Sequence, residues 1–254
     1  MLISRSDQEI NSLFSSRIIK HLINNYQKYY FGTCVKFIGD NMTNNIPTEN
    51  EEAKNYDREV KVYNSYAHDV MFGMCFEFVK SNENLLDLGI GTGLASINFS
   101  RIGLNIYGID VSSEMLEVCN SKSFAKALLL HNLSDYPIPW KDAYFNHVIC
   151  CGVLHFIKDL TSIFAEVKRL IKKNGIFAFT ISPLKISRKS IDYHDCIESP
   201  TGWGVSIWKH SQEYIQKLLD DFKFELIKEQ RVLFKDADKI EFNMEFSVLI
   251  TRCL

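Results

Sequence analysis

Residues 85–110, LLDLGIGTGLASINFSRIGLNIYGID, decide the fold. An apolar run ends in three glycines at alternate positions, Gly89, Gly91 and Gly93, and a second apolar run ends at Asp110. A glycine loop between a strand and a helix brings backbone N–H groups close to a ligand, and such loops commonly bind nucleotides. The segment therefore predicts a strand, a nucleotide-binding loop, a helix and a second strand.

The spacing of these glycines differs from two common phosphate-binding loops. A dinucleotide-binding loop follows G-x-G-x-x-G, but Leu94 stands at the third glycine position here. A Walker loop needs a lysine after its glycines, and none follows. Asp87 ahead of the loop would repel a pyrophosphate and would suit an ammonium or sulfonium group. Because Asp110 is placed to accept hydrogen bonds from ribose hydroxyls, the expected ligand is a nucleoside with a cationic arm and no phosphate.

Short apolar strands alternate with amphipathic helices from residue 84 onward. The predicted elements are strands at 84–88, 105–109, 126–130, 147–151 and 176–181 and helices at 94–101, 112–121 and 158–172. The second helix opens with a capping-box pattern, and the third ends in Lys172 and Lys173 before Gly175. Strands separated by helices indicate βαβ crossovers and a mainly parallel sheet. The expected fold is a doubly wound, Rossmann-like α/β domain.

The C-terminal part departs from this alternation. A helix is predicted at 211–221, followed by strands at 222–232 and 240–251 that a short polar loop, KDADK, joins. A loop of that length connects antiparallel neighbours and is too short for a crossover helix. An antiparallel strand is therefore expected at the end of the sheet.

The N-terminal part is predicted to be helical. Apolar residues recur with helical spacing at 11–40 and 54–79, and a polar, asparagine-rich linker at 41–52 separates them. We predict an N-terminal helical extension and linker over 1–55 and one α/β domain over 56–254.

Composition narrows the class of protein. The chain has 254 residues, a net charge of −2 and no long run of lysine or arginine, so we expect a small-molecule substrate and no nucleic-acid partner. The sequence contains neither an apolar run of membrane-spanning length nor the apolar core of a signal peptide. Its seven cysteines include no CxxC pair, which favours reduced thiols and no metal site. We expect a cytoplasmic protein without a membrane partner.

The motifs resemble those of a known family. LLDLGIGTGL followed by IYGIDVSSEML resembles the first two motifs of class I S-adenosylmethionine-dependent methyltransferases of the domain 11 and 25 types. HNLSDYPIPWKDAYFNHVICCGVLHFIKDL is similar to their third and fourth motifs, and LIKKNGIFAFTIS to the following glycine and fifth strand. The tail WKHSQEYIQKLLDDFKFELI is similar to the TPR-repeat-type and Williams–Beuren-region methyltransferase-like subgroup.

This resemblance covers roughly residues 56–254, and its implications go beyond the motifs. It implies a seven-stranded, mainly parallel sheet with an antiparallel C-terminal strand. It also implies S-adenosyl-L-methionine as methyl donor and methyl transfer to an oxygen, nitrogen or carbon atom of a small molecule.

The resemblance further assigns roles to individual residues. Asp87 would orient the methionine ammonium through the loop, and Asp110 would hold the ribose. The residues implied in cofactor binding are Asp87, Gly89, Ile90, Gly91, Gly93, Leu94, Asp110, Val111, Met115, Asn132, Leu133, Gly152 and the lid candidate Tyr66, with Tyr63 as a second lid candidate. Asn132 and Ile90 depart mildly from the family pattern. His155 would lie beside the reactive methyl group and is the candidate general base.

Alternatives remain beside this interpretation. A regulatory or partner protein that binds S-adenosylmethionine without turnover would share the loop motifs but lack an open acceptor cavity. An NAD-dependent oxidoreductase is disfavoured by Leu94 and by the antiparallel end of the sheet. His155 is equally well explained as a packed histidine. The acceptor pocket is expected from the N-terminal helices, the loop after the fourth strand and residues 183–208, where no motif is found.

Overall fold

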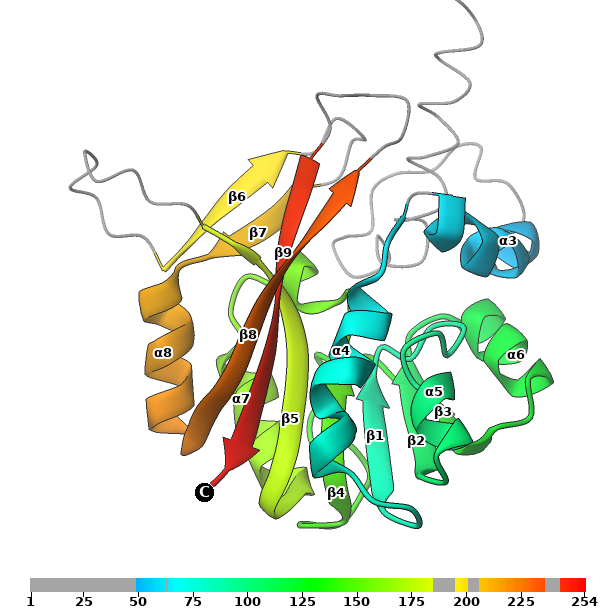
Figure 1. Ribbon diagram of the computed structural model, residues 1–254, viewed down its shortest axis with the longest axis horizontal. Helices are drawn as coiled ribbons and strands as arrows, with labels where there is room; N and C mark the ends of the chain where they lie inside the picture. Colours follow the sequence, from blue (N-terminus) through cyan, green and yellow to red (C-terminus); the bar gives the residue numbers. More distant parts are fainter. Residues whose placement is uncertain (1–48, 63, 185–194, 201–205, 236–242) are drawn as a thin grey trace, which may run out of the picture.

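The computed structural model describes residues 49–62, 64–184, 195–200, 206–235 and 243–254 (Figure 1). The predicted helix at 11–40 and the lid candidate Tyr63 lie outside these residues. Helix α3 (Glu49–Val62), helix α4 (Ala67–Cys75) and the 3-10 turn η2 (Phe76–Phe78) precede the sheet. The predicted boundary between residues 55 and 56 falls inside α3 and stays a prediction.

The single helix predicted over 54–79 is wrong, because the chain breaks between α3 and α4. Asn64 adopts a φ of 51°, a left-handed conformation that asparagine tolerates better than most residues. The Ser65 N–H donates to the Val60 carbonyl at 3.0 Å and closes the end of α3. The last residues of the predicted linker, 49–52, belong to α3.

Seven strands of the described chain form the central sheet. They are β1 (Asn84–Leu88), β2 (Asn105–Asp110), β3 (Ala125–Leu130), β4 (Phe145–Cys150), β5 (Ile171–Pro183), β8 (Phe224–Lys235) and β9 (Asn243–Cys253). Their spatial order is β3-β2-β1-β4-β5-β9-β8 (Figure 1). Strand β9 runs antiparallel to both of its neighbours, and the other neighbouring pairs are parallel. The predicted Rossmann-like fold class is confirmed.

Two further strands lie in and just beyond residues 183–208, the segment in which no sequence motif is found. Strands β6 (Cys196–Pro200) and β7 (Ser206–His210) pair antiparallel with each other. Strand β7 then pairs in parallel with the last two residues of β5, Ser182 and Pro183. This pair extends the sheet at the end where the parallel strands finish (Figure 1).

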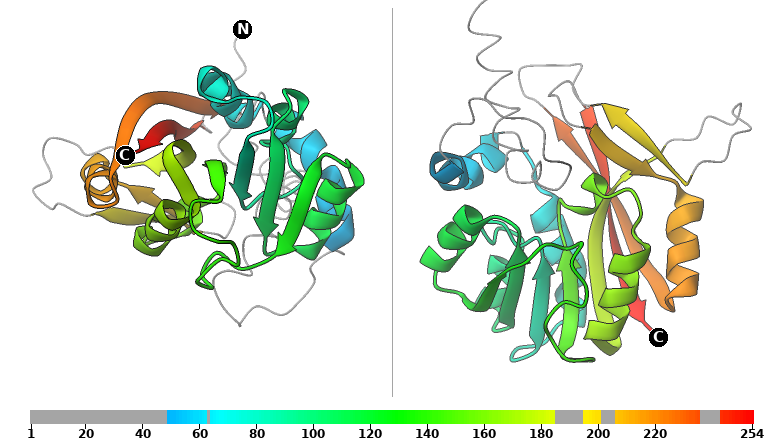
Figure 2. Two further views of the ribbon diagram at one scale, coloured as in Figure 1. Left: turned by 90° about the horizontal axis from the view of Figure 1, so that it is seen from below. Right: turned by 180° about the vertical axis from the view of Figure 1, so that it is seen from behind.

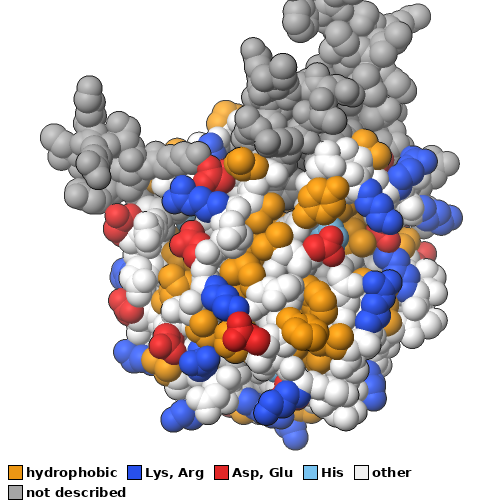
Figure 3. All heavy atoms as spheres, in the orientation of Figure 1, with side chains coloured by type: hydrophobic (Ala, Val, Ile, Leu, Met, Phe, Trp, Pro, Cys, Tyr) orange, Lys and Arg blue, Asp and Glu red, His pale blue; other side chains and the backbone are white. Residues whose placement is uncertain are grey.

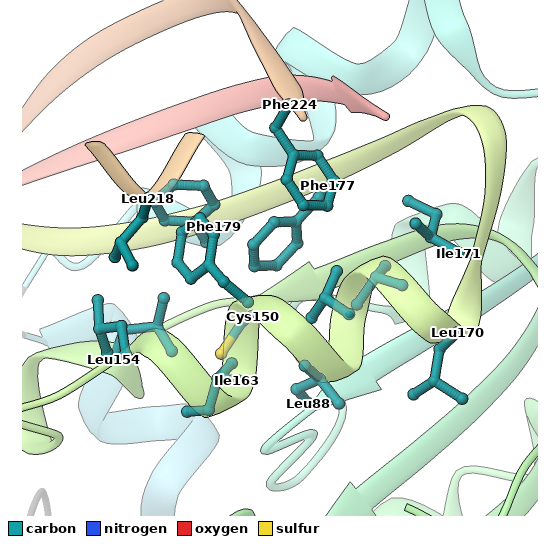
Figure 4. Close-up of a cluster of buried hydrophobic side chains, with 14 of the residues drawn as sticks. Leu88, Cys150, Leu154, Ile163, Leu170, Ile171, Phe177, Phe179, Leu218 and Phe224 are labelled. Carbon is teal, nitrogen blue, oxygen red and sulfur yellow. The ribbon is translucent and has the colours of Figure 1, made fainter. Parts of the chain in front are cut away.

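Helices cover both faces of the sheet (Figure 2). Helices α4, α5 (Ile97–Arg101) and α6 (Ser113–Ser121) bury one apolar cluster, which includes Met71 and Phe99. Helices α7 (Thr161–Leu170) and α8 (Gln212–Asp221) bury the other. In that second cluster the Phe164 ring packs edge-on against Phe177 and Phe179, with centroids 5.4 Å apart in each case. Figure 4 shows Phe177 and Phe179 beside Leu218 and Phe224 in this cluster. Apolar burial on both faces explains the continuous apolar runs of the parallel strands.

Helix α7 ends earlier than predicted. It stops at Leu170, and Lys172 and Lys173 lie at the start of β5 rather than in the last helical turn. Asn174 adopts a φ of 66° within β5, where the pairing of β5 with β4 shifts register. Gly175 is needed there because a Cβ atom would lie 2.2 Å from the Asn146 carbonyl oxygen.

The start of α6 differs in detail from the predicted capping box. Ser112 is the N-cap, and its hydroxyl accepts the Met115 N–H at 3.2 Å. The third helical position is therefore Met115, which cannot return a hydrogen bond as glutamate would. Helix α5 begins at Ile97, three residues later than predicted, because residues 94–96 form turns.

The N-terminal helices are fastened to the C-terminal strands. Lys228 of β8 donates to the Met74 carbonyl at 3.2 Å and pairs with Glu77 of η2. Its ammonium group also lies 4.9 Å from the ring centre of Phe78. Basic and acidic side chains are interspersed with apolar patches on this face (Figure 3). None of the described helices has the length and apolarity needed to cross a membrane.

Candidate functional site

The glycine loop connects β1 to α5 and folds back onto the end of β2. The N–H groups of Gly89 and Ile90 both donate to the Ile109 carbonyl, at 2.8 and 2.9 Å. Gly89, Gly91 and Gly93 have φ values of 77°, 54° and 86°. These are left-handed conformations that glycine adopts without steric cost. The alternate glycines are therefore required by the path of the backbone.

The glycines differ in what a side chain would meet. A Cβ atom on Gly91 would point into open space, and the same holds for Gly152 after β4. A Cβ atom on Gly89 would lie 2.5 Å from Val153, and one on Gly93 would lie 2.4 Å from Phe124. The prediction that all three loop glycines allow close approach of a ligand stays a prediction, and their surroundings differ. Gly91 and Gly152 leave room beside the backbone, whereas Gly89 and Gly93 are required for packing.

Asp110 ends β2 and holds the loop. Its Oδ2 accepts the Gly91 N–H at 2.8 Å, and its Oδ1 accepts the Ser112 N–H at 2.9 Å. Burial raises the pKa of this carboxyl group, while these backbone N–H groups act in the opposite direction. Each carboxylate oxygen retains a second lone pair, so Asp110 is able to accept further hydrogen bonds from a ligand.

Asp87 lies beneath the loop and is 1% exposed. Its Oδ2 accepts the Ser96 hydroxyl at 2.5 Å, and its Oδ1 has no hydrogen-bond partner among the described residues. Burial raises the pKa of Asp87 to about 7, against the opposing hydrogen bond from Ser96, and the nearby charge of Asp110 raises it further. A cationic group above the loop would stabilise the ionised form. The carboxylate of Asp87 is thus placed to attract a cationic group of a ligand on the other side of the loop.

Two cavities meet at the loop. The first, which we call the Asp110 cavity, is lined by Tyr56, Gly89, Gly91, Asp110, Val111, Met115, His131, Leu133, Cys151, Gly152 and Val153. The second, the His155 cavity, is formed by residues of the loop, α3, α4, the 3-10 turn η3 (Leu154–Phe156), β5 and β9. Tyr56, Gly89, Gly91, Cys151 and Gly152 line both. The two cavities therefore adjoin across the two glycines that leave room for a ligand.

The His155 cavity has few ionisable groups. His155 is 5% exposed, and burial, with a smaller contribution from His210, lowers its pKa to about 3. Burial also lowers the pKa of His68, despite the nearby charge of Asp69. The Thr180 hydroxyl accepts the Gly152 N–H at 2.7 Å. The cavity is therefore mainly apolar, with neutral hydrogen-bonding groups in its wall.

Comparison with known protein families identifies the domain that forms these cavities. Residues 86–179 match a family described as a methyltransferase domain. This segment therefore carries a methyltransferase domain, and the predicted resemblance to class I S-adenosylmethionine-dependent methyltransferases is confirmed. The cofactor of this family is S-adenosylmethionine, and the features that fit it here are the room beside Gly91 and Gly152 and the unpartnered oxygen of Asp87.

Individual relatives match parts of this chain. A putative methyltransferase, YqeM of Bacillus subtilis, is 36% identical over 109 residues, or 41% of this chain and 44% of the relative. A demethylmenaquinone methyltransferase of Tropheryma whipplei is 25% identical over 97 residues, or 38% of this chain and 41% of the relative. This chain thus spans less than half the length of either relative.

Solved structures share the fold at low identity. Magnesium protoporphyrin IX methyltransferase of Synechocystis with bound S-adenosylmethionine superposes with a TM-score of 0.56 at 15% identity, with both chains covered completely. A putative methyltransferase of Haloferax volcanii in complex with the activator Trm112 has a TM-score of 0.58 at 14% identity, over 80% of this chain and 94% of the other.

The structure brings most of the predicted site residues together. Those that line one or both cavities are Gly89, Ile90, Gly91, Leu94, Asp110, Val111, Met115, Leu133, Gly152 and His155. Asp87 and Gly93 lie behind the loop, as described above. The side chain of Asn132 accepts the Ser134 N–H at 2.8 Å, and the neighbouring His131 lines the Asp110 cavity instead.

The lid candidate Tyr66 lines neither cavity, whereas another tyrosine, Tyr56, lines both. Tyr66 is 50% exposed, and its hydroxyl donates to the Asn64 side chain at 3.0 Å, outside both cavities. Tyr56, in the middle of α3, lines both cavities and was missed as a site residue. An aromatic-rich helix is the only sequence signal that pointed to it.

Helix α3 is tied to the loop by an ion-pair network. Asp57 accepts the Thr92 hydroxyl at 2.5 Å and pairs with Lys122 at the end of α6. Lys122 also donates to the Thr92 carbonyl at 2.8 Å. Because Asp57 adjoins Tyr56 in sequence, we expect this network to hold Tyr56 against the shared region of the cavities.

Proposed function

We propose that this chain catalyses S-adenosylmethionine-dependent methylation of a small-molecule acceptor. The observation that carries the proposal is the pair of adjoining cavities, which runs from the Asp110 carboxylate past Gly91 and Gly152 to His155. A nucleoside with a methionine arm has the chemistry for the first part of this path. The second part then remains for the acceptor.

Different residues of the chain bind different parts of the cofactor. Asp110 accepts hydrogen bonds from the ribose hydroxyls, and Val111, Met115 and Leu133 supply apolar contacts to the base. Asp87 favours the cationic arm from beneath the loop. These are the predicted roles, and the positions of the four cavity-lining residues support them.

S-adenosylmethionine, when bound, would supply an electrophilic methyl group whose bonding electron pair stays with sulfur, and the acceptor atom that takes the methyl group would release a proton. The cavity walls supply proximity and alignment, which contribute about 7–11 kcal/mol at best. A histidine with a pKa near 3 takes up a proton poorly at neutral pH. We therefore propose that His155 binds the acceptor as a neutral group and that the released proton goes to water.

The names of two similar proteins support a small acceptor. One relative is named a demethylmenaquinone methyltransferase, and one structural neighbour a magnesium protoporphyrin IX methyltransferase. Both names state an organic small molecule. The cavity, rather than an open groove, is the feature of this chain that agrees with such an acceptor.

Calorimetric titration with S-adenosylmethionine, S-adenosylhomocysteine and NAD tests the cofactor. We expect binding of the first two, and the Asp110→Ala variant should bind them much more weakly while remaining folded. Binding of NAD alone would contradict the proposal. Incubation of a metabolite extract with isotope-labelled cofactor, followed by mass spectrometry, then tests turnover. Cofactor binding without any labelled product would favour a regulatory protein.

A further inference from the structure

One part of the His155 cavity is built from elements that are far apart in the sequence. It consists of His155 and Phe156 of η3, Thr180 of β5, and Met244 and Phe246 of β9. We call these five residues the acceptor wall, and none of them lines the Asp110 cavity. The His155 ring lies 4.0 Å from that of Phe156 and 4.9 Å from that of Phe246, centre to centre. The wall is therefore largely aromatic.

Two polar groups of the acceptor wall have hydrogen-bonding capacity to spare. Thr180 is 1% exposed, and its Oγ1 accepts the Gly152 N–H, but no described residue accepts its own hydroxyl hydrogen. Among the described residues, the buried His155 Nδ1 has no hydrogen-bond partner, and none bonds to its Nε2. An unmet buried polar group costs about 1–3 kcal/mol. Polar side chains with unused hydrogen-bonding capacity beside a cavity indicate that a ligand supplies the missing hydrogen bonds.

The lining carries no formal charge among the described residues. Neither Asp, Glu, Lys nor Arg is found among the lining residues of the His155 cavity. Its titratable side chains are those of Tyr56, His68, Cys151 and His155, and burial keeps both histidines neutral and the Cys151 thiol protonated by raising its pKa. A charged group that entered this cavity would lose its hydration and gain no counter-charge.

We propose that the acceptor wall binds an uncharged, hydroxylated aromatic ring, with one ring hydroxyl held by the Thr180 hydroxyl and the His155 Nε2. A hydroxyl suits both partners because it accepts from Thr180 and either donates to or accepts from an imidazole nitrogen. The ring packs on Phe156 and Phe246, where ring–ring contact adds to apolar burial. This inference rests on the proposed function, since it names the acceptor class of the same site.

The charge preference is tested with two matched probes. Catechol is an uncharged hydroxylated ring, and 3,4-dihydroxybenzoate is the same ring with a carboxylate. Calorimetry of each probe against the full chain saturated with S-adenosylhomocysteine should show catechol binding at least about tenfold more tightly, because the carboxylate must be desolvated. Equal or tighter binding of 3,4-dihydroxybenzoate would overturn the inference.

Variants test the two hydrogen-bonding groups. Thr180→Val removes the hydroxyl at nearly constant volume and should weaken catechol binding about three- to tenfold. Thr180→Ser, which keeps the hydroxyl, should restore it, and His155→Phe should weaken it similarly. Thr251→Val is the matched control, because Thr251 is a buried strand threonine whose hydroxyl donates to the Phe177 carbonyl at 2.9 Å. Unchanged catechol binding in both Thr180→Val and His155→Phe would contradict the inference.

The two levels of the proposal fail in different ways. Failure of the wild-type chain to bind S-adenosylhomocysteine would contradict the proposed function itself. Binding of S-adenosylhomocysteine without any binding of catechol would leave the proposed function standing and would overturn the acceptor class.

Discussion

The Asp110 cavity and the acceptor wall adjoin in space and are built in different ways. Apart from Tyr56, the lining of the Asp110 cavity comes from residues 89–153, at or just after the ends of the parallel strands β1, β2, β3 and β4. The acceptor wall takes residues from η3, β5 and β9, which are separated by up to about ninety positions of chain. One part therefore repeats the same position in successive parallel strands, and the other also depends on how the antiparallel strand β9 packs.

The two regions also differ in their polar chemistry. The Asp110 cavity holds a buried carboxylate that two backbone N–H groups stabilise. The acceptor wall holds a hydroxyl and a neutral imidazole, with no charge. Substitutions on the two sides should accordingly separate cofactor binding from acceptor binding. The following changes test that separation, from the largest expected effect to the smallest.

The largest effect is expected from a pair of alanine substitutions in the loop. Gly91→Ala places a Cβ atom in the open space of the cavity and should weaken S-adenosylhomocysteine binding about 100-fold, or about 3 kcal/mol. Gly93→Ala instead brings a Cβ atom within 2.4 Å of Phe124 and should lower the free energy of unfolding by about 2–4 kcal/mol. Calorimetry and chemical denaturation measure the two effects. Identical behaviour of the two variants would show that the loop glycines do not divide into these roles.

The ionisation of Asp87 should appear in the pH dependence of stability. Its pKa is about 7 in the folded chain and near 3.8 when unfolded, so the folded state binds the extra proton between these values. The free energy of unfolding contributed by Asp87 should therefore fall as the pH rises from about 4 to 7, by about 1–3 kcal/mol.

Asp87→Asn isolates this contribution, since asparagine does not ionise. The difference in unfolding free energy between wild type and Asp87→Asn, measured by denaturant titration at pH 4 to 8, should fall with pH and level off above about 7. Subtraction removes the contributions of His147, His155 and His210, whose lowered pKa values act in the opposite direction. A difference independent of pH would show that Asp87 has an ordinary pKa.

A smaller effect is expected at the network that ties α3 to the loop. Asp57→Asn should weaken S-adenosylhomocysteine binding about three- to tenfold, because this partly exposed ion pair contributes about 1 kcal/mol. Lys122→Met should have a similar effect, and the double variant should be little worse than either single one. Lys126→Met on the exposed edge of β3 is the control. Additive effects of Asp57→Asn and Lys122→Met would mean that the two residues act independently.

The smallest effect is a gain in stability away from both cavities. Gly73 lies in α4, is exposed, and a Cβ atom there would have no neighbour within 4 Å. Gly73→Ala should raise the free energy of unfolding by about 0.5–1 kcal/mol through helix propensity and leave ligand binding unchanged. Gly175→Ala is the contrasting control, because its Cβ would overlap the Asn146 carbonyl. Denaturant titration measures the free energy of unfolding of both variants, and a loss of stability in Gly73→Ala would contradict the prediction.

The parts predictable from sequence are those set by neighbouring residues. The strands β1 to β5, the loop and the positions of Asp87 and Asp110 followed from apolar runs, glycine spacing and charge. The antiparallel end of the sheet followed from the short loop before residue 240. The resemblance added the further residues predicted to contact the cofactor; of these, Asn132 lines neither cavity, and its side chain accepts the Ser134 N–H within a turn.

Sequence could not supply contacts that depend on long-range packing. Met244 and Phe246 belong to a strand whose apolar pattern is that of any core strand, and only the pairing of β9 with β5 brings them to the cavity. The strands β6 and β7 carried no recognisable pattern. The pKa of His155 is likewise a product of burial by distant residues, so the residue read equally well as a base and as a packed side chain.

The reversed direction of β9 has an evolutionary consequence. Because β9 is antiparallel to β5, its first residues, and not its last, lie at the edge where the parallel strands end and the cavities open. Met244 and Phe246 can therefore be exchanged in a descendant sequence without touching any residue of the glycine loop. Under the proposed function, substitutions at the start of β9 would change which acceptor is bound, while the residues proposed to bind the methyl donor stay the same.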